Sequence, residues 1–89
     1  MNEIVQLNQI RQHIQQLFQS NPNIKVNVSL KKPKLNLCDV PVKIVGVYPH
    51  IFQIEEETSD GRKRYTLQYT DVLLHNIEIL ENANAADRN

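Results

Sequence analysis

The fold is decided by the stretch Ile24-Lys25-Val26-Asn27-Val28-Ser29-Leu30, residues 24–30. Apolar and polar residues alternate along it, which is the pattern of a strand with one face on a core and the other in water. Pro22 precedes this two-residue period. Upstream of Pro22 the apolar residues recur every three or four positions, so the chain passes from helix to sheet at this point.

The segment before Pro22 is predicted to form one amphipathic helix of about 16 residues. Its apolar residues share one stripe, and the other faces carry glutamine and asparagine. The stripe consists of Ile4, Leu7, Ile10, Ile14, Leu17 and Phe18. The helix should end at Ser20-Asn21, because a residue that precedes proline is disfavoured from the α region.

Four further strands are predicted after residue 30. In chain order, the sequence indicates a loop over 32–39, a strand over 40–48, a strand around Phe52 and Ile54, a strand over 65–69, a helical turn over 72–74 and a last short strand over 77–79. Pro49 and the Asp60-Gly61 pair mark two of the turns between them. Thr70 or Asp71 is expected to cap the helical turn.

These elements predict a mainly β fold, in which an N-terminal α-helix is followed by a small five-stranded antiparallel barrel of the SH3-like or Sm-like kind. Many short strands in a small chain need closure to avoid exposed edges. An open sheet with the helix on one face is the main alternative. A single helix-plus-barrel domain is expected over residues 1–80, and the polar residues 81–89 are expected to form a disordered tail.

Composition limits the classes of function that fit. Ten basic residues balance ten acidic ones, which removes the electrostatic argument for a dedicated nucleic-acid binder. The single cysteine, Cys38, is expected to be a small buried hydrophobe in a reducing compartment. The start of the sequence lacks the regions of a signal peptide, and no apolar run reaches the roughly 18 residues of a membrane span. The sequence therefore predicts a cytoplasmic protein without membrane contact.

No motif for catalysis, metal binding or cofactor binding is found. His13, His50 and His75 lack the spacing of a metal site and have no second type of ligand clustered nearby. Glycine occurs only at positions 46 and 61, so no phosphate-cradling loop is available. We therefore expect a protein that is not an enzyme and holds neither a cofactor nor a metal.

Two basic clusters are the candidate contact residues for a partner or a nucleic acid. One lies in a lysine-rich stretch, and the other directly follows an acidic one. The candidates are Lys31, Lys32, Lys34, Arg62, Lys63 and Arg64. Solvated loops without a binding role are the simpler interpretation of both.

Two motifs in the second half of the chain point to a known family. They are Tyr48-Pro49-His50-Ile51-Phe52-Gln53-Ile54 and, after the charged turn, Tyr65-Thr66-Leu67-Gln68-Tyr69-Thr70-Asp71-Val72-Leu73. Together they resemble the Tyr-Pro-x-x-Phe and Tyr-x-Tyr-x-Asp-[Val/Ile]-Leu signature of the Veg family of low-GC Gram-positive bacteria, and the resemblance covers roughly residues 7–80. It implies an SH3-like barrel with a leading helix, no known enzymatic activity, and a link to stimulation of biofilm formation through transcriptional control.

Two details of the resemblance bear on the site. The basic Gly-Arg-Lys-Lys-like segment of the family falls near Lys31-Lys32-Pro33-Lys34, without its glycine or arginine. The signature residues themselves have a mainly structural interpretation, with the aromatic ones lining the barrel and the acidic one capping a turn. These residues are Tyr48, Pro49, Phe52, Tyr65, Tyr69 and Asp71.

The favoured function is a non-enzymatic regulatory protein of the Veg type. It would bind a protein partner, such as a transcriptional regulator, through an exposed face or edge strand, and so influence transcription and biofilm formation. The alternative is a small SH3-like or Sm-like module that binds RNA or DNA, with the basic clusters on phosphates and tyrosines stacked on bases. The balanced charge disfavours nucleic acid, and homo-oligomerisation stays open.

Overall fold

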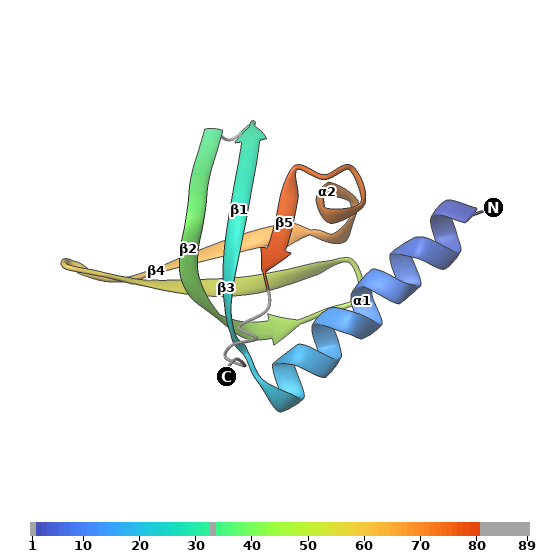
Figure 1. Cartoon of the computed structure of the whole chain (residues 1–89), viewed down its shortest axis with the longest axis horizontal. Helices are drawn as coiled ribbons and strands as arrows, with labels where there is room; N and C mark the ends of the chain where they lie inside the picture. The colour runs from blue at the N-terminus through green and yellow to red at the C-terminus, as the bar shows by residue number, and fades with distance from the viewer. Residues whose placement is uncertain (1, 33, 81–89) are drawn as a thin grey trace, which may run out of the picture.

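The computed structural model of the chain describes residues 2–32 and 34–80 (Figure 1). The elements are α1 (Asn2–Ser20), β1 (Asn23–Lys31), β2 (Lys34–Val47), β3 (Ile51–Thr58), β4 (Gly61–Gln68), α2 (Tyr69–Leu73) and β5 (Ile77–Leu80). The predicted content of a leading helix followed by five antiparallel strands is confirmed. The predicted tail over 81–89 lies outside the described residues.

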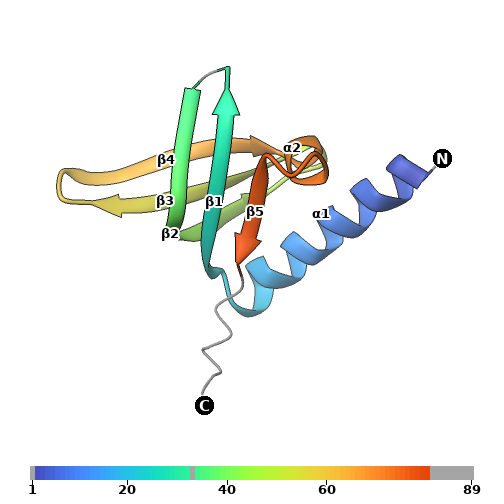
Figure 2. The same cartoon turned by 45° about the horizontal axis from the view of Figure 1, so that its top comes forward.

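The five strands form one antiparallel sheet in the order β4-β3-β2-β1-β5. Its two edge strands, β4 and β5, do not pair with each other in the described chain, so the sheet is not closed and the predicted barrel is wrong. The sheet is rolled instead. Figures 1 and 2 show β1, β5 and the start of β2 lying side by side along one axis, with β3 and β4 crossing that axis.

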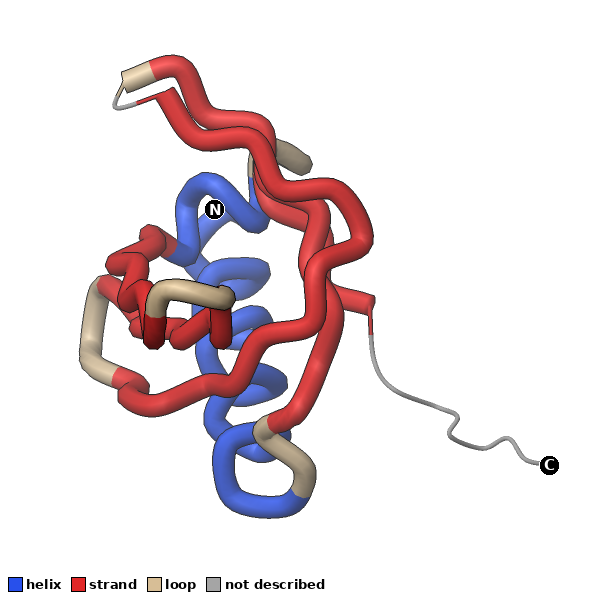
Figure 3. The backbone as a smooth tube through the Cα atoms, turned by 90° about the vertical axis from the view of Figure 1, so that its left-hand side faces the viewer, coloured by secondary structure: helices blue, strands red, loops and turns tan. Residues whose placement is uncertain are grey.

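Strand β2 makes this rolled shape possible because it belongs to both parts of the sheet. It is 14 residues long, and it pairs with β1 before it pairs with β3. The helices α1 and α2 pack on each other, and α1 also packs on β2. In Figure 3 the strands curl around one side of the molecule and α1 passes across the open side. A covering helix thus does part of what strand closure would do in a barrel.

The start of β2 lies in the segment predicted to be a loop. A bulge explains the difference, because Val26 pairs with Val40 whereas Val28 pairs with Leu37, which leaves one extra residue on β2. Asp39, within the bulge, has a φ of +55°, in the left-handed region. The extra residue shifts the alternation of apolar side chains, so the pattern reads as irregular in the sequence although the strand continues.

The bulge is held by a side chain from β1. The backbone N–H of Asp39 donates to Asn27 Oδ1 at 2.6 Å, and Asn27 Nδ2 donates to Glu78 Oε1 on β5 at 3.0 Å. Cys38 lies on this bulge and is exposed. The prediction of a buried thiol is therefore wrong, because the bulge places Cys38 on the solvent side of β2.

The core lies between the rolled sheet and α1. Its buried residues are Ile14, Ile24, Val26, Val28, Val42, Ile44, Phe52, Ile54, Leu67, Tyr69 and Ile77. The helical stripe packs on this core through Leu7, Ile10, Ile14 and Leu17. Phe18, at the end of the predicted stripe, is 38% exposed, and the side chain of Ile4 lies outside the described part.

Candidate functional site

Two of the signature residues form the centre of the core. Phe52 opens the buried face of β3, and Tyr69 is the first residue of α2. Their rings are stacked, with centroids 5.5 Å apart and planes at 17°. The Tyr69 hydroxyl donates to the carbonyl oxygen of Tyr48 at 2.6 Å. This contact ties the start of α2 to the residue that follows β2.

The Tyr-Pro pair at the start of the signature lies on the outside. Tyr48 is 47% exposed, whereas the sequence analysis placed it among the residues that line the interior. Its ring covers Gly46, because a Cβ added to Gly46 would lie 2.7 Å from Tyr48 Cε2. Pro49 follows in the turn between β2 and β3, which the Tyr48 N–H closes by donating to the Ile51 carbonyl oxygen at 2.9 Å.

The other two signature residues make polar contacts. Tyr65 is half-buried, and its hydroxyl donates to Glu56 Oε1 at 3.0 Å. Burial, and then this neighbouring carboxylate, raise the pKa of Tyr65.

Asp71 does not cap the helical turn. The N-cap of α2 is Gln68, which makes no capping hydrogen bond through its side chain, and Asp71 lies inside the helix. It accepts two hydrogen bonds from Asn76, one at its backbone oxygen (2.9 Å) and one at Oδ1 (3.3 Å). The prediction that Thr70 or Asp71 caps this helix is wrong, because the helix begins at Tyr69 and both residues lie inside it.

The second basic cluster lies on β4, where each of its residues stands opposite an acid on β3. The register pairs Glu55 with Arg64, Glu56 with Lys63, and Glu57 with Arg62. Cross-strand pairs of opposite charge stabilise a hairpin modestly. The acidic and basic stretches of the sequence are thus the two strands of one hairpin.

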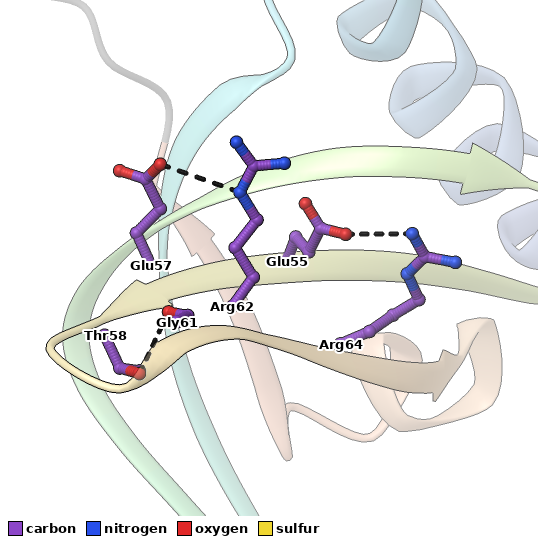
Figure 4. A network of polar contacts seen from close by, with 6 residues as sticks. All are labelled: Glu55, Glu57, Thr58, Gly61, Arg62 and Arg64. Atoms are coloured by element: carbon purple, nitrogen blue, oxygen red, sulfur yellow. Dashed lines mark hydrogen bonds and ion pairs between the residues drawn. The ribbon is translucent and has the colours of Figure 1, made fainter.

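Two of these pairs are ion pairs on one face of the hairpin (Figure 4). Arg64 Nη2 lies 2.8 Å from Glu55 Oε2, and Arg62 Nε lies 3.8 Å from Glu57 Oε2. The hydrogen bond from Arg64 holds the pKa of Glu55 below its usual value, and desolvation opposes this effect. The Arg62 and Glu57 side chains are 68% and 83% exposed, so this pair contributes little to stability.

The first basic cluster lies elsewhere. Lys31, Lys32 and Lys34 are exposed at the tip of the β1–β2 hairpin, where Lys31 pairs in register with Lys34. Figures 1 and 2 show this tip and the tip of the β3–β4 hairpin pointing in different directions. The structure therefore does not bring the two clusters together.

Two lysines that were not among the predicted contact residues, Lys25 and Lys43, lie beside the second cluster. Lys43 pairs with Glu55 and so stands on the face that carries the ion pairs. Lys25 and Lys43 line a depression of about 520 Å³ together with Glu57 and Arg62. Lys25 occupies a polar position in the alternating segment 24–30, and this pattern could have identified it as a residue on the solvent face of β1.

Comparison with known proteins identifies the family. The model of the family described as "Biofilm formation stimulator VEG" matches residues 5–80. The chain belongs to the Veg family. The resemblance inferred from the two tyrosine motifs is therefore confirmed, and the family description links the chain to stimulation of biofilm formation. No curated protein and no solved structure matches the chain significantly.

The Veg family description does not name an enzyme. The description names a stimulator of biofilm formation, which is not a known class of enzyme. Among residues 2–32 and 34–80, no group of three or more His, Cys, Asp or Glu side chains could hold a metal ion. No helix within the same residues has both the length and the apolar character needed to cross a membrane.

Proposed function

We propose that this member of the Veg family acts in the cytoplasm as a non-enzymatic regulator that binds a protein partner. The partner we propose is a regulator of transcription, through which the chain would stimulate biofilm formation. The contact surface we propose is the outer edge of β4 together with the basic residues Arg62, Lys63 and Arg64.

The observation that carries this proposal is the unpaired edge of β4. This strand is eight residues long, pairs with β3 on one side, and ends the sheet in the described chain. The N–H and C=O groups on its other side are available to an extended segment of a partner, which would add to the sheet as a further strand. The opposite edge, β5, is only four residues long, so it offers fewer backbone hydrogen bonds.

The charges on β4 favour an acidic partner segment. Charged side chains on an edge strand oppose indiscriminate pairing with other strands, and three consecutive basic residues would repel a second copy of β4. Carboxylates on an incoming strand would instead complement Arg62 and Lys63. The Arg62–Glu57 pair is well exposed and is therefore easily exchanged for a partner carboxylate.

The alternative of nucleic-acid binding receives less support from the arrangement. The lysines of the β1–β2 tip and the basic residues of β4 lie on hairpins that point apart.

A pair of charge-neutralised variants tests the proposal. The double variant Arg62→Gln/Lys63→Gln alters β4, and Lys31→Gln/Lys32→Gln is the matched control on the other hairpin. All four side chains are exposed, so each change should alter stability by no more than about 0.5 kcal/mol. Each variant replaces the native copy in cells, where biofilm mass is measured, and a tagged version is purified with and without nuclease.

The β4 variant should lose biofilm stimulation together with a co-purifying protein that resists nuclease. The control variant should keep both. Loss of the co-purifying protein on nuclease treatment, or loss of stimulation in the control variant alone, would contradict the proposal and favour the nucleic-acid alternative.

A further inference from the structure

A cleft of about 440 Å³ lies between α1, the β2–β3 turn and the start of α2. Leu7, Pro49 and Ile51 give it an apolar wall, to which Tyr69 contributes. Its lining reaches Gln68 at the end of β4, but it includes none of the basic residues Arg62, Lys63 and Arg64 of the proposed protein contact. Its volume falls in the range of roughly 300 to 1,000 Å³ that is typical of small-molecule sites.

The positive charge of the cleft comes from α1. Arg11 is half-buried and lines the cleft one helical turn after Leu7, so both residues are on the same face of α1. It lies close enough to Tyr69 for its charge to act against the burial that raises the pKa of that hydroxyl. Among the side chains that the structure describes, no acidic one lines the cleft.

Arg11 has no ion pair or hydrogen bond from its side chain to any residue that the structure describes. A half-buried guanidinium loses part of its hydration, and a bidentate oxyanion is the ligand that restores its hydrogen bonds best. Asn8 and His50 also line the cleft, and each can donate a further hydrogen bond.

We propose that this cleft binds a small organic anion, with one phosphate or carboxylate group on Arg11 and an apolar or planar body against Leu7, Pro49 and Ile51. The charge selects the anionic group, and the apolar wall selects the body that carries it. An inorganic anion would leave the wall unfilled, so it should bind more weakly than an organic one. Phosphate and carboxylate share the chemistry that the guanidinium recognises.

Titration with matched probes tests the proposal. Phenyl phosphate and benzoate carry both features, inorganic phosphate carries only the charge, and benzyl alcohol carries only the ring. At least one of the first two should bind the whole chain with a Kd below about 1 mM, as measured by calorimetry. Inorganic phosphate and benzyl alcohol should each bind at least tenfold more weakly. The probe that binds more tightly distinguishes a phosphate from a carboxylate ligand.

Variants of Arg11 and of a distant basic residue locate the site. Arg11→Gln should weaken binding of the preferred probe at least tenfold, Arg11→Lys should weaken it less, and Lys32→Gln at the exposed tip of the β1–β2 hairpin should leave it unchanged. In the unmodified protein, the Nε–H resonance of Arg11 should shift on titration while that of Arg62 does not, a readout that does not depend on the variants folding. Unchanged affinity in folded Arg11→Gln, no shift at Arg11, or a Kd above about 1 mM for both organic anions would overturn the proposal.

Discussion

At the scale of single residues, the Tyr69 hydroxyl joins two segments that are 21 positions apart in the sequence. It is the polar end of an otherwise buried ring, and the carbonyl oxygen of Tyr48 is its partner at 2.6 Å. Tyr69→Phe keeps the stacking on Phe52 but leaves this carbonyl without its donor. We expect the free energy of unfolding to fall by about 1 to 3 kcal/mol, measured by urea denaturation at pH 8.

The same tyrosine should make the free energy of unfolding depend on pH in the alkaline range. Burial raises the pKa of Tyr69 in the folded state above the usual value for a tyrosine, so the folded state holds this proton more tightly than the unfolded state. The resulting stability is fully present below the unfolded pKa and is lost as pH rises through the folded pKa. Denaturation between pH 9 and 11 should show a smaller loss in Tyr69→Phe than in the unmodified protein, with the remaining loss including that from Tyr65, whose pKa is also raised. Equal losses would contradict this assignment.

Substitution of Phe52 tests whether this residue lies on the buried face of β3. It is fully buried and stacked on Tyr69, so Phe52→Ala should cost about 3 to 5 kcal/mol. This is a large part of the roughly 5 to 15 kcal/mol that stabilises a typical domain. The variant should be mostly unfolded in a thermal melt, whereas Phe18→Ala, which alters a partly exposed phenylalanine, should be affected much less. A melting temperature within a few degrees of the parent for Phe52→Ala would show that Phe52 is not in the core.

At the scale of elements, the sequence predicted α1 and β1 well because each follows one period from end to end. The strand predicted around Phe52 and Ile54 continues to Thr58, where the apolar alternation has already stopped. The prediction failed on the first half of β2, where the bulge at Asp39 moves the apolar positions from Leu37 to Val40. A period-two pattern cannot reveal such a shift, since the extra residue is polar and looks like part of a loop. Asn27, which accepts the hydrogen bond that holds the bulge, lies on a different strand, so the residues next to Asp39 in the sequence give no sign of this contact.

The candidate site was predictable only in part for a related reason. The charges at 55–57 and 62–64 and the turn between them are visible in the sequence, and they do form one hairpin. The position of that hairpin at the edge of the sheet depends on which strands pair, and the approach of Arg11 to the β2–β3 turn depends on how α1 packs. Both features arise from tertiary structure, which cannot be inferred from amino-acid composition or from the spacing of apolar residues.

The bulge leads to a prediction at this scale. Asp39 has a left-handed φ of +55°, a conformation that glycine adopts without strain and that costs other residues roughly 1 to 2 kcal/mol. Asp39→Gly should keep or slightly raise the free energy of unfolding, and Asp39→Ala should lower it by about 1 kcal/mol, because alanine tolerates this conformation less well than aspartate. Chemical denaturation of the two variants beside the parent measures the difference, and an alanine variant as stable as the glycine variant would argue against a left-handed residue here.

At the scale of the whole molecule, the sheet is open where a closed barrel was predicted. The prediction assumed that short strands must close to hide their edges, but here α1 and α2 cover the opening and charged residues occupy β4. Hydrogen exchange distinguishes the two arrangements. In the open sheet, the β4 amides that point away from β3 should exchange quickly, while those of the central strand β2 exchange slowly. Uniform protection along β4 would instead indicate a closed barrel or a strand already bound to that edge.

The order of the strands in the sheet also affects how the chain folds during synthesis. The β1–β2, β2–β3 and β3–β4 pairs join neighbours in sequence, whereas the β1–β5 ladder joins Lys25 to Leu80 and Val28 to Ile77. Local pairs close early, and distant ones bear a larger loop-closure entropy. During synthesis, β1 must therefore remain an uncovered edge until β5 has left the ribosome. The nascent chain therefore exposes β1 as a second unpaired edge strand, in addition to β4, for a short time. A ribosome that stalls before residue 77 holds a chain prone to aggregation.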